Sequence, residues 1–95
     1  MTALIEDLHG IGKVSKEGAA IGEVEYSIRV YQAGDQGWAY PFAQFRPRQN
    51  LDFYGLVGQR ITLHLEDGRL WDCLIQSLDG KVTAAGHWPT KQEHP

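Results

Sequence analysis

The chain has 95 residues, of which 42% are hydrophobic and 22% charged, and its formal net charge is −3. This length corresponds to one domain, and the composition is that of a globular protein rather than a disordered one. The negative charge disfavours a dedicated nucleic-acid binder, which usually presents a basic face. No apolar run approaches the ~20 residues that span a bilayer, and Glu6 and Asp7 interrupt the place of a signal peptide's apolar core. The single cysteine, Cys73, cannot form an intramolecular disulfide, so we expect a cytoplasmic protein.

The N-terminal residues have the spacing of a short helix. Leu4, Ile5 and Leu8 would share one helical face, and Gly10 is a helix-stopping residue. We therefore expect a short N-terminal helix, with a first strand that starts this early as the alternative, because one or two helical turns are marginal alone.

Residues 10–16 and 20–32 predict a β-hairpin that turns at or near Glu17-Gly18. In the second arm, apolar and polar side chains alternate, which is typical of a half-buried strand. One face carries Val24, Tyr26, Ile28 and Val30, and the other carries Glu23, Glu25, Ser27, Arg29 and Tyr31.

Residues 33–59 are ambiguous, because 27 residues are too many for a structureless loop in a compact domain. Alternating aromatic residues predict a short strand here, and Pro41 would confine it to a sheet edge. These aromatic residues are Trp38, Tyr40 and Phe42. Pro47 and Asn50 predict turns after this strand.

Residues 60–78 predict a second hairpin around an Asp-Gly turn. A two-residue loop would pair Leu63 with Asp72 and place a carboxylate on the apolar face. A three-residue loop that ends at a left-handed Gly68 pairs Leu63 with Trp71 instead. Because burial decides register, we predict the three-residue loop. In this register the side chains that point inward are Ile61, Leu63, Leu65, Trp71, Cys73 and Ile75.

Asp79-Gly80 turns the chain into a last short strand, 81–85, and the polar tail 89–95 is expected to fray. The count is five strands with one long connection. This pattern favours an all-β fold over residues 1–88, a small antiparallel barrel of the Greek-key or SH3-like kind, which closes to hide its edges.

The second hairpin also has the pattern of a known motif. Residues 58–79 combine alternating apolar residues, a glycine turn, an aromatic residue three positions later and an acidic residue at the end. The positions are Gly68, Trp71, Cys73, Ile75 and Asp79. This pattern resembles the first motif of Sm-like proteins, a family of small β-barrels that bind RNA as rings. The second Sm motif, an Arg-Gly pair in the closing strands, is absent from the sequence, and Cys73 stands where glycine is usual.

The other polar residues indicate structure rather than chemistry. The four histidines have no metal-ligand spacing, and Cys73 has no cysteine partner, so we expect no metal site. In the predicted register Cys73 points inward, which makes it an inert thiol rather than a nucleophile for His64. The Gly-Ile-Gly stretch at 10–12 lacks the context of a phosphate loop and is interpreted as a flexible part of a strand. We expect no catalytic residue and no cofactor.

The segment from Trp38 to Tyr54 is the unusual feature of the sequence. It holds six of the ten aromatic residues, with Arg46 and Arg48 on either side of Pro47. Rings beside arginines suit peptide recognition, cation–π contacts and base stacking, whereas the alternative is that the rings complete the core. The candidate partner-binding residues are Trp38, Tyr40, Phe42, Phe45, Arg46, Arg48, Phe53 and Tyr54.

We therefore expect a non-catalytic barrel that binds a protein or peptide partner, a second copy of itself included, through this segment. At least two of the rings and one of the two arginines should share an exposed face. Single-stranded RNA binding by the same residues is one alternative, and a small enzyme or enzyme subunit whose site forms on oligomerisation is another. We expect no membrane partner.

Overall fold

The computed structural model describes residues 2–33, 39–48 and 51–89, and these contain six β-strands. The strands are β1 (Thr2–Lys16), β2 (Ala19–Ala33), β3 (Ala39–Pro47), β4 (Arg60–His64), β5 (Leu70–Ile75) and β6 (Lys81–Ala84). They pair antiparallel and close into a barrel in the order β1-β2-β3-β6-β5-β4. The prediction of a small antiparallel β-barrel is confirmed, and the ambiguous segment supplies the additional strand, β3. Across these ranges no helix has the length and apolar character needed to cross a membrane.

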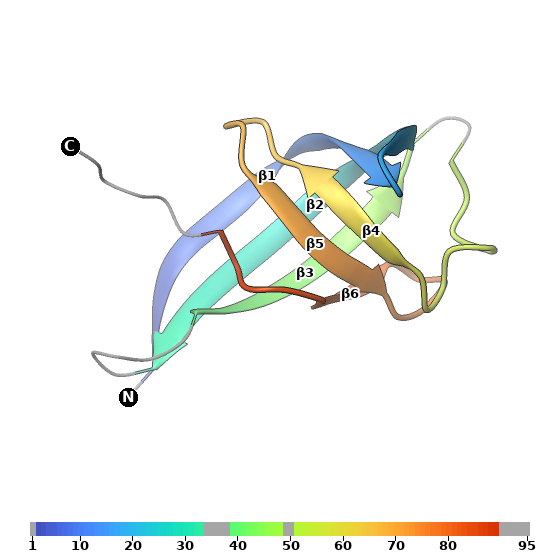
Figure 1. Ribbon diagram of the computed structural model, residues 1–95. Coiled ribbons are helices and arrows are strands. Elements are labelled where there is room, and N and C mark those ends of the chain that lie inside the picture. The colour runs from blue at the N-terminus through green and yellow to red at the C-terminus, as the bar shows by residue number, and fades with distance from the viewer. Residues whose placement is uncertain (1, 34–38, 49–50, 90–95) are drawn as a thin grey trace.

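The barrel consists of two three-stranded meanders that cross one another (Figure 1). Strands β1–β3 are long, and β4–β6 are short. The meanders meet over three residues of β1 with β4 and over two residues of β3 with β6. The long meander therefore continues past the barrel as a three-stranded ribbon, at the end of which the N-terminus lies (Figure 1).

The expected N-terminal helix is wrong, and the alternative of an early first strand holds. β1 pairs with β2 along its length, and this pairing outweighs the weak local preference for one or two helical turns. A bulge between Leu4 and Glu6 shifts the alternation by one residue. Leu8 consequently packs against the core while Leu4 is half exposed. Leu4 and Leu8 therefore lie on opposite sides of the sheet rather than on one shared helical face.

Both predicted hairpins are confirmed. At the first turn, Glu17 and Gly18 have φ angles of 52° and 82°, as a two-residue type I′ loop requires. In the second hairpin, Leu63 lies opposite Trp71 and Gly68 has a φ of 95°. The three-residue loop is therefore correct, and the carboxylate of the alternative register stays outside the core.

The glycines at 10–12 have a packing role. Gly10 lies opposite Tyr26, and a Cβ at Gly10 would come within 2.8 Å of the Tyr26 hydroxyl oxygen. A Cβ at Gly12 would lie 2.6 Å from the carbonyl oxygen of His64 in β4. Because real Cβ atoms do not approach other atoms so closely, these glycines let the Tyr26 ring and β4 reach the backbone of β1.

β3 contains Pro41 and Pro47 and extends further than the predicted short strand. The Phe45 N–H donates to the Gly80 carbonyl, so odd-numbered positions of β3 direct their backbone groups away from β2. Both prolines occupy odd-numbered positions and cost no hydrogen bond to β2. Pro41 also lies beyond the two residues that pair with β6, at the predicted edge position. Asn50, where a further turn was predicted, lies outside the described residues.

The core fills the barrel and contains every residue that the two hairpins were predicted to bury together. These are Val24, Tyr26, Ile28, Val30, Ile61, Leu63, Leu65, Trp71, Cys73 and Ile75. The structure adds Val14, Ala43, Phe45, Phe53, Val82 and Trp88. The additions come from β1, β3, β6 and the segments that follow β3 and β6.

The C-terminal segment returns to the ribbon and covers its inner side. Trp88 packs edge-on against Trp71, with ring centroids 5.2 Å apart, and its Nε1 donates to the Glu6 carboxylate. Arg69 donates two hydrogen bonds to Glu6 and one to the carbonyl of Pro89. Of the tail that was predicted to fray, only Pro89 lies among the described residues, and this contact holds it.

Candidate functional site

The predicted site residues separate into a buried set and an exposed set. In β3, Phe45 is 1% exposed and Phe42 is 64% exposed. In the connection to β4, Phe53 is buried and Tyr54 is exposed, while Trp38 lies outside the described residues. Two of the predicted rings thus belong to the core, as the alternative interpretation expected for all of them, and three lie at the surface.

The register of β3 sets this division. Phe45 lies opposite Tyr26, and its ring meets Trp71 edge-on with centroids 6.4 Å apart. Side chains alternate between the two faces of a strand, so a shift of one residue would expose Phe45 and bury the even-numbered residues of β3. The large apolar area that Phe45 buries therefore holds Phe42 on the outside.

The outer side of the ribbon carries an apolar cluster that we call the aromatic face. It consists of Leu4 in β1, Tyr31 in β2, and Tyr40 and Phe42 in β3. Leu4, Tyr31 and Tyr40 lie opposite one another in a single row across the three strands. Phe42 follows in the next row, and its ring meets Tyr31 edge-on with centroids 5.6 Å apart. The face therefore spans all three strands of the ribbon.

A shallow hollow of about 540 Å³ opens on this face, and we call it the aromatic hollow. It is lined by Thr2, Arg29, Tyr31, Tyr40 and Phe42. Arg29 supplies the positive charge in this lining, and it has no ion-pair partner among the described residues. Its neighbour across the strands, Asp7, lies 3.0 Å from the ring of His9 instead. The hollow thus combines three rings with an available guanidinium.

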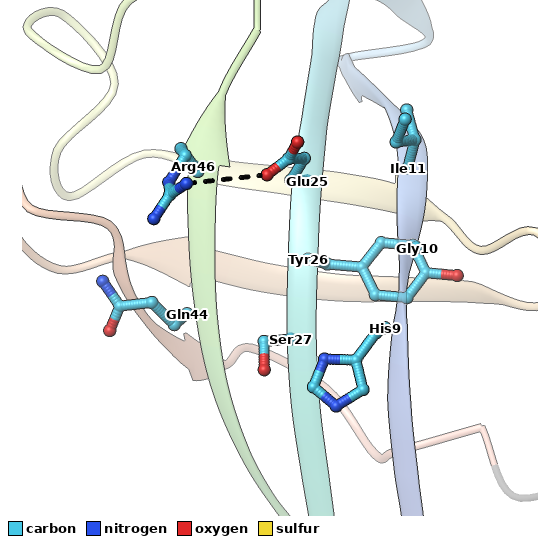
Figure 2. Close-up of a pocket in the computed structure, with 8 residues that line it drawn as sticks. All are labelled: His9, Gly10, Ile11, Glu25, Tyr26, Ser27, Gln44 and Arg46. Carbon is cyan, nitrogen blue, oxygen red and sulfur yellow. Dashed lines mark ion pairs between the residues drawn. The ribbon is translucent and has the colours of Figure 1, made fainter.

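The two predicted arginines pair with glutamates at the other end of the sheet. Arg46 lies 3.9 Å from Glu25, and Arg48 lies 3.8 Å from Glu23 and 3.6 Å from Glu25. Arg46 extends from the same side of β3 as the aromatic face, but its guanidinium contacts Glu25 rather than a ring (Figure 2). Arg46 thus shares an exposed side of the sheet with Tyr40 and Phe42, as predicted, while Arg29 is the arginine that lies beside the rings.

A second shallow hollow, of about 430 Å³, continues along the same outer side (Figure 2). His9, Ser27 and Gln44 form the row that follows the row of Phe42. The pair of Arg46 and Glu25 belongs to the row after that. This part of the surface therefore offers hydrogen-bond donors and acceptors beside the aromatic face.

Two residues that were considered for catalysis or metal binding have other roles. The Nε2 atom of His64 lies 3.1 Å from the hydroxyl of Ser15 on the neighbouring strand. Burial, with a smaller contribution from the charge of Asp72, raises the pKa of the Cys73 thiol to about 12. A thiol that stays protonated at neutral pH is a poor nucleophile. No three His, Cys, Asp or Glu side chains in the described part of the chain are arranged to hold a metal ion.

Three residues of this surface were not predicted from the sequence: Leu4, Arg29 and Tyr31. The alternation of β2 already indicated that Arg29 and Tyr31 point outward, but not that β3 brings more rings beside them. The bulge in β1 concealed the outward direction of Leu4. Pairing between distant strands, rather than a local pattern, assembles the face.

No protein-family model, curated protein or solved structure matches this chain. The resemblance of residues 58–79 to an Sm-like motif stays a prediction.

Proposed function

We propose that this protein is a non-catalytic β-barrel module that binds a protein or peptide partner through the aromatic face. The observation that carries the proposal is the joint exposure of Leu4, Tyr40 and Phe42, at 50%, 46% and 64%, on one side of the ribbon. Contiguous apolar side chains on the surface of a small protein usually mark a contact site. Aromatic residues and arginine are also enriched in interfaces, and Arg29 lies among these rings.

The open strand edges favour binding through side chains rather than through an added strand. The edge of β1 carries a bulge and the charged Asp7, and the Glu66 carboxylate accepts a hydrogen bond from the Ile11 N–H at 2.8 Å. On β3, Pro41 lies at the open edge and offers no N–H. Bulges, charges and prolines at an edge oppose pairing with a further strand. A partner therefore meets the outer side of the sheet.

Single-stranded RNA is the alternative partner, because exposed rings beside an arginine also stack bases. The net charge of −3 opposes it, and the ion pairs of Arg46 and Arg48 with glutamates leave fewer cations for phosphates. A second copy of the chain belongs to the class of protein partners. The lone Cys73 is compatible with the cytoplasmic location that we propose.

Selection from a library of random displayed peptides tests the proposal. We expect selected peptides to lose about tenfold in affinity with Tyr40→Ser and with Phe42→Ser, because each substitution removes a ring from the contact. Tyr54→Ser is the matched control, since Tyr54 is exposed but does not line the aromatic hollow. Equal affinity for all variants would contradict the proposal. Binding of a labelled oligouridylate, together with failure to select any peptide, would also contradict the proposal.

A further inference from the structure

The aromatic hollow adjoins a groove between β3 and β6. These strands pair over two residues and then diverge, and the gap forms a depression of about 550 Å³ that we call the split groove. Arg29 and Phe42 line both the hollow and the groove, and Lys81 of β6 lines the groove. Further polar lining comes from Ser27, Gln44, Gln76 and Thr83. A ligand that passes over Phe42 would contact both depressions.

The charged side chains that line these two depressions are cationic, although the whole chain carries −3. Their charged groups are Arg29 and Lys81, and within the described ranges no carboxylate lines either depression. The hydrogen bond from Ser77 and the nearby Lys81 lower the pKa of Asp79, so a carboxylate lies near Lys81. Among the described residues, neither Arg29 nor Lys81 has an ion-pair partner. Arg29 lines both depressions and can bind a carboxylate through two hydrogen bonds, so it is the stronger of the two anion-binding groups.

We propose that the partner is an extended peptide segment in which an apolar side chain is flanked by carboxylates. The apolar side chain enters the aromatic hollow, and the carboxylates pair with Arg29 and, in the split groove, with Lys81. An apolar side chain gains free energy by leaving water, and a guanidinium binds a carboxylate through two parallel hydrogen bonds. This inference rests on the proposed function and adds the chemistry of its partner.

The observations favour an acidic peptide over a nucleic acid. A phosphate backbone needs a series of cations along its path, whereas hollow and groove together present two. Glu25 lies on the same outer side of the sheet, beyond both depressions, and would repel a long polyanion. The Gln44 amide donates to the Asp79 carbonyl and keeps its oxygen as an acceptor, and the Gln76 amide can donate and accept, as the backbone of an extended peptide requires.

Fluorescence anisotropy with three labelled, end-capped peptides tests this inference. In these peptides the same phenylalanine is flanked by aspartates, by asparagines or by lysines. We expect the aspartate peptide to bind about tenfold tighter than the asparagine peptide, and the lysine peptide to bind weakest. Arg29→Gln should reduce the tenfold preference to about threefold or less, and Lys81→Gln should have a smaller effect in the same direction.

Matched controls are Arg46→Gln and Lys13→Gln, which remove the same charges from positions that line neither hollow nor groove. Both should keep the preference for aspartate, and thermal unfolding of each variant verifies its fold. Equal binding of the three peptides, or a preference that survives Arg29→Gln, overturns the inference. If library peptides still depend on Tyr40 and Phe42 in that case, the proposed function stands. If no library peptide depends on Tyr40 and Phe42, both proposals fail. Both also fail if oligouridylate binds tighter than the aspartate peptide and Arg29→Gln weakens the binding of oligouridylate.

Discussion

Arg69 and Glu6, 63 residues apart in the chain, form a two-pronged ion pair with N···O distances of 3.0 and 2.8 Å. Their side chains are only 12% and 14% exposed. The guanidinium also donates to Asp67 and lies 5.3 Å from the centroid of the Trp88 ring. This cluster joins β1 to the β4–β5 loop and to the C-terminal segment. It therefore closes the barrel beyond the three residues where β1 pairs with β4.

The first prediction concerns Glu6→Gln, which keeps the size of the side chain and removes its charge. Burial alone would raise the pKa of Glu6, but hydrogen bonds from Arg69 and Trp88 and the charge of Arg69 bring it below its ordinary value of 4.5. Because the pair is mostly buried, we expect Glu6→Gln to lower the free energy of unfolding by about 2 kcal/mol at pH 7. Urea denaturation measures this difference.

The pH dependence of this difference in the free energy of unfolding distinguishes the effect of the charge of Glu6 from the effect of its shape. Since the folded-state pKa lies below the unfolded value, the contribution of Glu6 is complete above pH 4.5 and is lost as the pH falls through the folded-state pKa. A protonated Glu6 resembles glutamine, so wild type and Glu6→Gln should converge in acid. A difference that stays constant from pH 7 into acid would show that the charge of Glu6 does not stabilise the fold.

The second prediction compares two glycines with nearly the same positive φ angle. Gly68 and Gly80 have φ angles of 95° and 94°, but a Cβ at Gly68 would meet open space. A Cβ at Gly80 would lie 1.9 Å from the carbonyl oxygen of Phe45. We expect Gly68→Ala to cost about 1 kcal/mol from the left-handed conformation alone, and Gly80→Ala to cost more than about 3 kcal/mol because β3 must move. Equal shifts in melting temperature would refute the close contact at Gly80.

The third prediction concerns the rate at which Cys73 reacts with a thiol reagent. The side chain is fully buried, and burial raises its pKa to about 12, so the reactive thiolate is scarce at neutral pH. We expect slow labelling of the native protein and fast labelling in denaturant, followed by mass spectrometry. Rapid labelling of the native protein at pH 7 would reveal an accessible thiolate and would support a catalytic role for Cys73.

The parts of the fold that the sequence predicts are those in which local pattern and burial agree. The pairing of Leu63 with Trp71 followed from one rule, that a carboxylate stays out of the core. The direction of Leu4 did not follow, because a bulge shifts the phase of β1 and is specified by pairing with β2.

The candidate site, too, could be predicted from the sequence only in part. Alternation along β3 is visible in the sequence, but which of Phe42 and Phe45 faces inward depends on the partners that β3 finds in β2 and β6. Arg29 became the cation of the site only because β3 lies beside it. The contact of Glu6 with Trp88 joins residues 82 positions apart, and no local pattern predicts such a contact.

The last prediction compares the two phenylalanines of β3 as a test of whether the aromatic face is needed for folding. Phe45 is buried against Trp71, so Phe45→Ala should cost about 3 to 5 kcal/mol. A loss of that size can unfold a small domain, and Phe45→Leu supplies a milder variant of the same position, with an expected cost of about 1 kcal/mol.

Phe42 is 64% exposed and meets the ring of Tyr31 edge-on, so Phe42→Ala should change the free energy of unfolding by about 0.5 kcal/mol or less. Urea denaturation of the three variants decides the matter. Unchanged stability would show that the fold does not need this exposed ring, as the proposal that it contacts a partner requires. If Phe42→Ala instead destabilises the protein as much as Phe45→Leu, the aromatic face is part of the folding core, and the proposal that it binds a partner loses its basis.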